Sequence, residues 1–157
     1  MRYKWFQELN LTNIINYSPK TKQEKIFLNK YKQSNKQVND IFHWVIIPTF
    51  QDPYQMLKDS FESIKQSNFD NKKIILTLAW EEADKDNFMN IKKQFLEEYK
   101  DTFLFVNTTL HPKWIEWELQ WKWSNVSYSA KNTYRKILDL WIKGDNVIVS
   151  VMDSESI

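Results

Sequence analysis

The sequence predicts an α/β protein with a mainly parallel sheet and helices on both of its faces. Four short apolar runs, rich in β-branched residues, are separated by longer segments whose apolar residues recur with the helical period. Strands and helices that alternate in this way form parallel sheets with right-handed crossovers. Ligands of such sheets bind beyond the carboxyl ends of the strands, so we expect the functional residues there.

The composition is typical of one soluble domain. A chain of 157 residues buries roughly two-thirds of its unfolded surface. Its 22 basic and 20 acidic residues leave a net charge of only +2, whereas a nucleic-acid-binding surface needs basic residues gathered on one face. The absence of cysteine excludes disulfides and thiolate metal sites. No window has the roughly 18 apolar residues of a membrane-spanning helix, so we expect a soluble protein that does not bind nucleic acid.

Residues 1–41 are expected to form an N-terminal helical extension. This segment is rich in Lys, Gln and Asn, and its apolar residues predict one or two short helices. Pro19 should lie between them, because proline is tolerated only at a helix start. We find no candidate functional residue in this extension, and the main domain is expected to span residues 42–157.

The first half of this domain has two predicted strands and two predicted helices. The strands span 43–49 and 73–79, and the second is apolar almost throughout, as expected for a strand covered on both faces. A helix is predicted over 53–66, because proline suits its first position, and another follows the second strand. The residues expected to face the core are Met56, Leu57, Ser60, Phe61 and Ile64 in the first helix and Phe88, Ile91, Phe95, Leu96 and Tyr99 in the second.

The second half repeats the pattern around a long loop. A third strand is predicted over 102–107 and a fourth over 147–152. Residues 111–123 show no clean period and predict a long loop, which in a compact domain is usually functional or disordered. A third helix is predicted over 124–142, followed by a turn at 144–146. Its residues expected to face the core are Val126, Ala130, Tyr134, Ile137, Leu138 and Trp141.

Two carboxylates, Asp153 and Glu155, follow the fourth strand and flank one serine. Such a pair can hold a hard divalent cation, Mg²⁺ or Mn²⁺, which in turn neutralises a diphosphate. The pair therefore suits an activated phosphate ester as ligand. The simpler interpretation is a solvated loop or a helix cap.

A second acidic group, Glu81, Glu82 and Asp84, follows the second strand. A carboxylate there can accept hydrogen bonds from a nucleoside. The alternative is a charged first turn of the next helix, which the helix dipole favours.

The end of the long loop has Lys122, Ser124 and Asn125. The lysine can meet phosphate oxygens, and the amino end of the following helix can add backbone donors. The alternative is that Ser124 simply caps this helix. The two interpretations are compatible.

Together these blocks resemble the nucleotide-binding half of a family 2 glycosyltransferase. The resemblance depends on the order and spacing of Val-Ile-Ile-Pro-Thr-Phe, the acidic group, Lys-x-Ser-Asn and Val-Met-Asp-Ser-Glu, and it covers about residues 42–157. It implies a nucleotide-diphospho-sugar transferase fold of the GT-A type. It also implies transfer of a sugar from a nucleotide-diphospho-sugar, expected to be a UDP-sugar, to an unknown carbohydrate or lipid-linked acceptor.

The resemblance implies a role for each block. The end of the first strand would line the nucleoside pocket, a glutamate would contact base or ribose, and the lysine would approach the diphosphate. The nucleotide-binding residues implied are Pro48, Thr49, Phe50, Glu81, Glu82, Lys122 and Asn125. The metal ligands implied, for Mg²⁺ or Mn²⁺, are Asp153 and Glu155.

The chain departs from the family in two ways that concern activity. Glu155 stands where the family has its second aspartate. The chain also stops soon after this motif, whereas family members continue into an acceptor half that supplies the catalytic base and often membrane segments. We therefore expect a fragment that has no catalytic base and does not transfer sugar alone. The parent protein is expected in the cytoplasm, with a membrane reached only through segments that are missing here.

A third departure is the tryptophan content. The chain has 8 tryptophans and one glycine, whereas about 7% of an average protein is glycine. The predicted loop contains Trp114, Trp117, Trp121 and Trp123, and the related sequences have glycine around the lysine. We hypothesise a gene in which UGA encodes glycine but was translated as tryptophan. The alternative is a genuine aromatic loop that stacks on sugar or base.

Two other function classes are open. The first is a non-catalytic nucleotide- or carbohydrate-binding module that uses this aromatic loop. The second is a nucleotidyltransferase on a similar sheet. The second class normally has a glycine-rich, basic phosphate loop after the first strand, and Gln51-Asp52-Pro53-Tyr54 is neither.

Overall fold

The structure is a computed structural model that describes residues 40–113, 115 and 122–154. The chain divides into two units, Met1–Ile41 and Phe42–Ile157. The helices expected in the N-terminal extension lie outside the described residues, and so do residues 114, 116–121 and 155–157.

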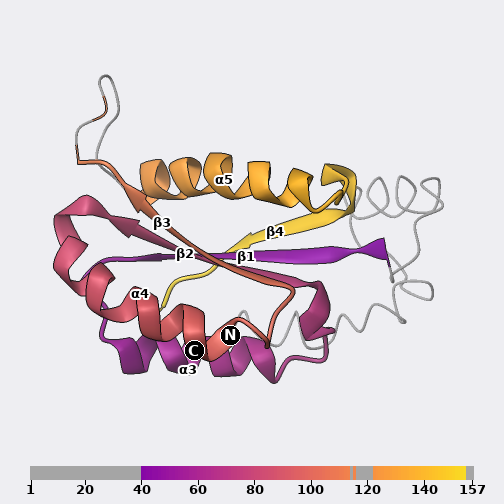
Figure 1. Ribbon diagram of the computed structural model, residues 1–157, viewed down its shortest axis with the longest axis horizontal. Coiled ribbons are helices and arrows are strands. Elements are labelled where there is room, and N and C mark those ends of the chain that lie inside the picture. Colours follow the sequence, from indigo (N-terminus) through magenta and orange to yellow (C-terminus); the bar gives the residue numbers. More distant parts are fainter. Residues whose placement is uncertain (1–39, 114, 116–121, 155–157) are drawn as a thin grey trace, which may run out of the picture. The chain divides into compact units, whose positions relative to one another are not determined.

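A parallel sheet forms the centre of the second unit (Figure 1). Within the described residues it has four strands in the order β3 (Phe105–His111), β2 (Ile74–Glu81), β1 (Phe42–Thr49) and β4 (Val147–Val151). Every neighbouring pair is parallel. The predicted α/β class with a parallel sheet is confirmed, and the strand order is that of a Rossmann-like sheet.

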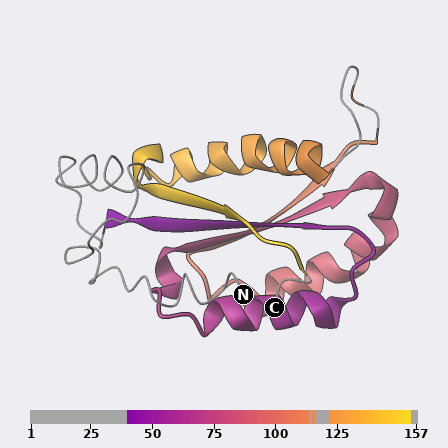
Figure 2. The same cartoon turned by 180° about the vertical axis from the view of Figure 1, so that it is seen from behind.

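Helices cover both faces of the sheet, as predicted. α3 (Tyr54–Lys65) and α4 (Lys85–Tyr99) lie on one face, and α5 (Lys122–Asp139) lies on the other (Figures 1 and 2). The chain winds outward from β1 to β3 through α3 and α4, and α5 then returns it across the sheet to β4. The winding direction therefore reverses between β1 and β4, which is the switch point where sheets of this class bind ligands.

The larger core lies between the sheet and the helix pair α3 and α4. Alternate strand residues point into it, as the two-residue period of a strand requires. Both predicted helix faces are confirmed except at Met56, since the other predicted residues are buried or pack against this core. The buried members are Val45, Ile47, Leu57, Phe61, Ile74, Leu76, Leu78, Trp80, Phe88, Ile91, Phe95, Tyr99 and Phe103.

The second core, under α5, mixes apolar and polar side chains. Its buried apolar members are Trp44, Ile46, Ile75, Ala79, Val126, Ile137 and Ile142. Beside them the Trp44 indole donates to Thr77 Oγ1 at 3.0 Å, and Asn107 Nδ2 donates to Thr133 Oγ1 at 3.0 Å. Lys136 Nζ donates to Asn107 Oδ1 at 2.7 Å. These bonds satisfy polar groups that would otherwise be costly to bury.

The predicted buried face of α5 was partly wrong. Tyr134, Leu138 and Trp141 are exposed by 42%, 48% and 93%, although they were expected in the core. Small polar residues occupy much of the buried face instead, namely Asn125, Ser129 and Thr133. They follow a four-residue spacing that ends at the buried Ile137, and a search for apolar residues alone cannot detect such a face.

Two element boundaries also differ from prediction. β3 begins at Phe105 rather than at residue 102, and it extends past Asn107 to His111. Its last residues are polar, yet Asn107, Thr109 and His111 are buried because α5 covers that face. α5 begins at Lys122 and ends at Asp139, so Ser124 lies inside the helix and is not its cap.

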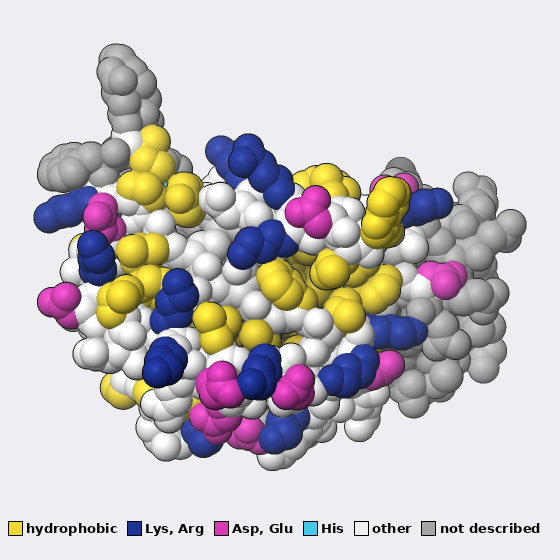
Figure 3. All heavy atoms as spheres, viewed as in Figure 1, with side chains coloured by type: hydrophobic (Ala, Val, Ile, Leu, Met, Phe, Trp, Pro, Cys, Tyr) yellow, Lys and Arg dark blue, Asp and Glu magenta, His cyan; other side chains and the backbone are white. Residues whose placement is uncertain are grey.

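Basic and acidic side chains are interspersed on the face of the molecule shown in Figure 3, and neither charge dominates a large area there. This agrees with the expectation of a solvated, nearly neutral surface. In the part of the chain that the structure describes, we find no helix that is both long and apolar enough to cross a membrane.

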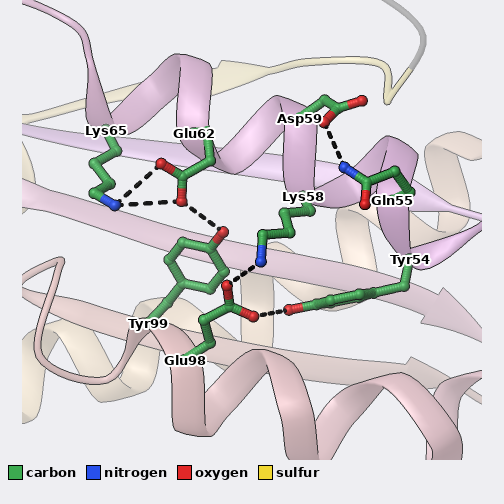
Figure 4. A network of polar contacts seen from close by, with 8 residues as sticks. All are labelled: Tyr54, Gln55, Lys58, Asp59, Glu62, Lys65, Glu98 and Tyr99. Carbon is green, nitrogen blue, oxygen red and sulfur yellow. Dashed lines mark hydrogen bonds and ion pairs between the residues drawn. The ribbon is translucent and has the colours of Figure 1, made fainter.

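A polar network joins α3 to α4 along their exposed side (Figure 4). The Tyr54 hydroxyl donates to Glu98 Oε2 at 2.6 Å, and the Tyr99 hydroxyl donates to Glu62 Oε1 at 3.0 Å. A hydrogen bond from Lys58 lowers the pKa of Glu98. A hydrogen bond from Lys65 lowers that of Glu62. Burial, reinforced by the carboxylates, raises the pKa of both tyrosines.

These shifts predict a stability plateau that is lost at both pH extremes. A carboxyl group with a lowered folded-state pKa stabilises above its ordinary value of 4.5 and loses that contribution as the pH falls further. A tyrosine with a raised pKa stabilises below its ordinary value of 10.0 and loses that contribution at higher pH. Urea midpoints measured from pH 3 to 11 should show both limbs. The acid limb should flatten in Glu98→Gln, and an unchanged acid limb would contradict the assignment.

Candidate functional site

The end of β1 forms one side of the switch point. Pro48 is buried. The Met152 N–H donates to the Ile46 carbonyl at 3.0 Å, so the side of β1 on which Pro48 lacks an N–H is the side of β4. β4 pairs with β1 only as far as Ile46, so Pro48 leaves no ladder bond unmade. Thr49 is also buried, and Phe50 is 49% exposed. This strand end thus places a hydroxyl and an aromatic ring at the edge where ligands bind.

The turn after β1 adopts an unusual backbone conformation. Gln51 has a φ of 58°, in the left-handed region that non-glycine residues rarely adopt. Its N–H donates to Asp84 Oδ2 at 2.7 Å. Local strain of this kind persists only where surrounding contacts over-determine it. The contact with Asp84 is one of those that hold the turn in place.

Asp84 connects the first two strand ends. It is only 9% exposed, and the same oxygen, Oδ2, also accepts from the Trp80 indole N–H at 3.1 Å and from Asn87 Nδ2 at 3.2 Å. Asn87 Nδ2 in turn donates to the Asp52 carbonyl at 3.2 Å. The carboxylate therefore positions the β1–α3 turn against the end of β2, and its role is internal.

The chain after β4 forms the other side of the switch point. Ser154 Oγ donates to Asp52 Oδ2 at 2.9 Å, and the Ser154 carbonyl accepts from Ser60 Oγ at 3.1 Å. These contacts bring the segment that follows β4 against the β1–α3 turn. Asp153 is exposed immediately before this buried serine. The structure thus brings the predicted aspartate beside the predicted nucleoside-binding turn.

The two predicted glutamates lie at the end of β2. Glu81 is its last residue and pairs in register with His111 of β3. Glu82 is exposed, and its Oε2 accepts from the Lys113 N–H at 2.9 Å. Both therefore lie at the carboxyl edge of the sheet, and Glu82 contacts the start of the predicted loop.

The first turn of α5 reaches the same edge. Asn125 is 2% exposed, and its Nδ2 donates to the Ala79 carbonyl in β2 at 2.7 Å. The backbone of Lys122 opens the helix, so the amino end of α5 is directed toward the carboxyl ends of the strands. A helix amino end attracts anions through its unpaired N–H groups.

Some buried polar side-chain atoms of the described residues have no hydrogen-bond partner. Among the described residues, the buried side-chain atoms of this kind are Thr49 Oγ1, Asn71 Oδ1, Thr109 Oγ1, Asn125 Oδ1 and Ser129 Oγ. Asn71 lies before β2, but the other four lie at the end of β1, at the end of β3 or in α5. Buried polar atoms are almost always paired with protein or water. Thr49 is in register with Trp80 and faces the core under α3 and α4, whereas Thr109 is in register with Ala79 and faces α5, so these atoms do not form one group.

The predicted metal site is only partly covered by the structure. Asp153 lies within the described residues and Glu155 lies outside them. No group of three or more His, Cys, Asp or Glu side chains that could hold a metal occurs in the described ranges. A magnesium ion on a nucleotide needs only one or two protein carboxylates, because phosphate oxygens and water complete its shell. Asp153 is exposed.

Several residues of this edge have contacts that the sequence-based prediction did not include. Asp84 was grouped with the neighbouring glutamates, and nothing local distinguishes a carboxylate that binds ligands from one that accepts three internal hydrogen bonds. Thr109 and His111 of β3 are buried under α5, and Ser129 is buried on α5 itself. The His111 ring meets the Tyr128 ring edge-on, with 5.1 Å between their centroids. The four-residue spacing of Asn125, Ser129 and Thr133 is the one signal that could have revealed this polar interface.

Comparison with known proteins does not assign this chain to a family. No protein-family model, no curated protein and no solved structure matches this chain.

Proposed function

We propose that this chain is the nucleotide-binding half of a metal-dependent glycosyltransferase that uses a nucleotide-diphospho-sugar. The observation that supports it most is the meeting of the Thr49–Asp52 turn with Asp153 and Ser154 at the switch point of the parallel sheet. The sequence motifs of the resemblance thus lie at one edge, although they are about a hundred residues apart in the chain. The GT-A assignment of the fold belongs to the same proposal.

Each group would have a separate task in donor binding. Thr49 and Phe50 would contact the nucleoside, with the unpaired Thr49 hydroxyl as a hydrogen-bond partner and the half-exposed ring as a stacking surface. Glu81 or Glu82 would accept hydrogen bonds from base or ribose. The amino end of α5 would face the diphosphate.

Asp153, with Glu155, would hold Mg²⁺ or Mn²⁺. The ion would neutralise the charge that develops on the leaving diphosphate. None of these residues is proposed as the base that deprotonates the acceptor. We therefore expect donor binding without sugar transfer.

Calorimetric titration with UDP tests this function. The chain should bind UDP in the presence of Mg²⁺ or Mn²⁺ and lose binding in EDTA. Asp153→Ala should weaken metal-dependent binding by roughly tenfold or more, at least as much as losing an outer-shell partner of a metal ligand costs. UDP binding that survives EDTA and is unchanged in Asp153→Ala would refute the proposal.

Asp139→Ala is the matched control for this substitution. Asp139 is also exposed, but it is the last residue of α5 and lies at the opposite edge of the sheet. Its replacement should leave UDP affinity unchanged. Circular dichroism of both variants should match that of the parent chain, so that a loss of binding reports the site and not the fold.

A second candidate is a carbohydrate- or nucleotide-binding module that uses aromatic stacking. The observation that favours it is Trp123, which is 71% exposed in the first turn of α5. This function predicts sugar or nucleoside binding that needs no metal and is lost in Trp123→Ala. Metal-dependent binding that persists in Trp123→Ala would exclude it.

A further inference from the structure

Helix α5 ends in a motif whose key position normally belongs to glycine. The Trp141 N–H donates to the Leu138 carbonyl at 2.9 Å, and the Ile142 N–H donates to the Ile137 carbonyl at 3.4 Å. This pair of bonds is the Schellman motif, with residue 141 as the first residue beyond the cap. Trp141 has a φ of 60° there, in the left-handed region. Glycine adopts this conformation without steric cost, whereas a side chain at Cβ opposes it.

Nothing in the environment of Trp141 offsets this cost by burial. Its side chain is 93% exposed, the largest exposure among the described large hydrophobic residues. Asn is the usual substitute for glycine at this position. A bulky aromatic side chain at this position therefore contributes little stabilisation through burial, and its Cβ strains the backbone.

The other described tryptophans fall into two classes. Trp44 and Trp80 are 3% and 0% exposed, and each indole N–H has a partner, Thr77 Oγ1 at 3.0 Å and Asp84 Oδ2 at 3.1 Å respectively. These are packed, hydrogen-bonded core residues. Trp123 shares the exposure of Trp141, since it is 71% exposed, but it lies within α5 and does not have a positive φ.

The one glycine in the sequence, Gly144, lies in the turn that follows α5. A Cβ added to it would lie 2.7 Å from the Tyr134 hydroxyl oxygen, which is the far end of a side chain that is 42% exposed and can move aside. Gly144 does not have a positive φ, so the left-handed position of this region is residue 141 and not the glycine.

We infer that positions 123 and 141 are glycine in the protein made by its source cell, and that Trp44 and Trp80 are genuine tryptophans. The gene would use a UGA codon, read as glycine in that cell, at 123 and 141, and UGG at 44 and 80. The exchange at these two positions would change the counts from 8 tryptophans and one glycine toward the usual balance, in which about 7% of residues are glycine. Position 141 carries the inference, because its backbone and hydrogen bonds are independent of any ligand.

Glycine at 123 has a consequence that depends on the proposed function. It would remove an exposed indole from the first turn of α5 and leave the backbone N–H groups of that turn open to a phosphate. UDP should then bind more tightly to Trp123→Gly than to the tryptophan chain. The Trp141 experiments need no nucleotide, so their outcome is separate from that of the proposed function.

Peptide-mapped mass spectrometry of the protein purified from its own source tests the inference directly. The peptides that contain positions 123 and 141 should have the masses of glycine forms, and those with positions 44 and 80 should have the masses of tryptophan forms. Codon identities in the gene should agree. Tryptophan at 141 would overturn the inference, and so would glycine at 44 or 80.

Recombinant variants test the backbone argument separately. Trp141→Gly should raise the urea midpoint of the full chain, and Trp141→Ala should fall below Trp141→Gly because alanine retains a Cβ at positive φ. Trp44→Gly should lower the urea midpoint sharply. This control shows that replacing tryptophan by glycine does not stabilise the chain at every position. A midpoint that is unchanged or lower in Trp141→Gly would contradict the assignment of position 141.

Discussion

Asp84→Ala should lower the free energy of unfolding by about 3 kcal/mol, because it leaves several donors unpaired at once. One carboxylate oxygen accepts from the Gln51 N–H, the Trp80 indole and the Asn87 amide. Each buried donor left without a partner costs about 1–3 kcal/mol. The indole of Trp80 is fully buried and cannot turn to water. Urea denaturation followed by circular dichroism measures the loss.

The same substitution should also impair the proposed nucleotide site. Without Asp84, the left-handed turn at Gln51 loses the contact to its N–H and should relax to an ordinary conformation. UDP affinity should therefore fall even at temperatures where the variant is folded. Asp86→Ala is the control, since Asp86 is exposed in the first turn of α4 and interacts mainly with the helix dipole. Equal losses in the two variants would show that Asp84 has no special role.

Trp44→Ala should destabilise the chain by about 3–5 kcal/mol, the range for large aromatic residues in a core. Trp44 lies under α5 and is 3% exposed, so its loss leaves a cavity between helix and sheet. It also removes the indole donor to Thr77 Oγ1. Thermal and urea unfolding should both show the decrease.

Trp123→Ala is the matched control, because it makes the same chemical change at a side chain that is 71% exposed. Surface substitutions of this kind usually change stability by less than about 0.5 kcal/mol. A small effect in Trp44→Ala, comparable to that of Trp123→Ala, would mean that α5 is not packed on β1 as described.

Strands and helices with an apolar signal were predictable from local pattern. β1, β2 and β4 and the buried faces of α3 and α4 agree with the sequence prediction to within a few residues. The apolar signal of β1, β2, α3 and α4 is strong because these elements supply the larger core. β4 is apolar as well, although its Ile148, Val149 and Val151 are 47%, 51% and 40% exposed. β3 and α5 were predicted less well, since their shared interface includes Asn107, Thr109, Ser129 and Thr133. A buried polar residue looks like a surface residue until its partner is known.

The candidate site shows the same division. That ligands belong at the carboxyl ends of the strands follows from the order of strands and helices alone, and so does the candidacy of the acidic and basic residues at those ends. Which carboxylates are free to act there depends on contacts between distant segments. The Asp84 carboxylate accepts a hydrogen bond from Gln51 in the β1–α3 turn. Ser154 donates one to Asp52, which lies about a hundred residues earlier in the chain.

Alternation and periodicity in the chain were therefore enough for the fold class, most elements and the edge that holds the candidate site. The tertiary structure decided the strand order, the internal role of Asp84, the polar interface under α5 and the left-handed backbone at residue 141. The physical reason is the distance along the chain over which each kind of interaction acts. Local patterns report which residues leave water, whereas hydrogen-bond partners and backbone strain are set by segments that meet only after folding.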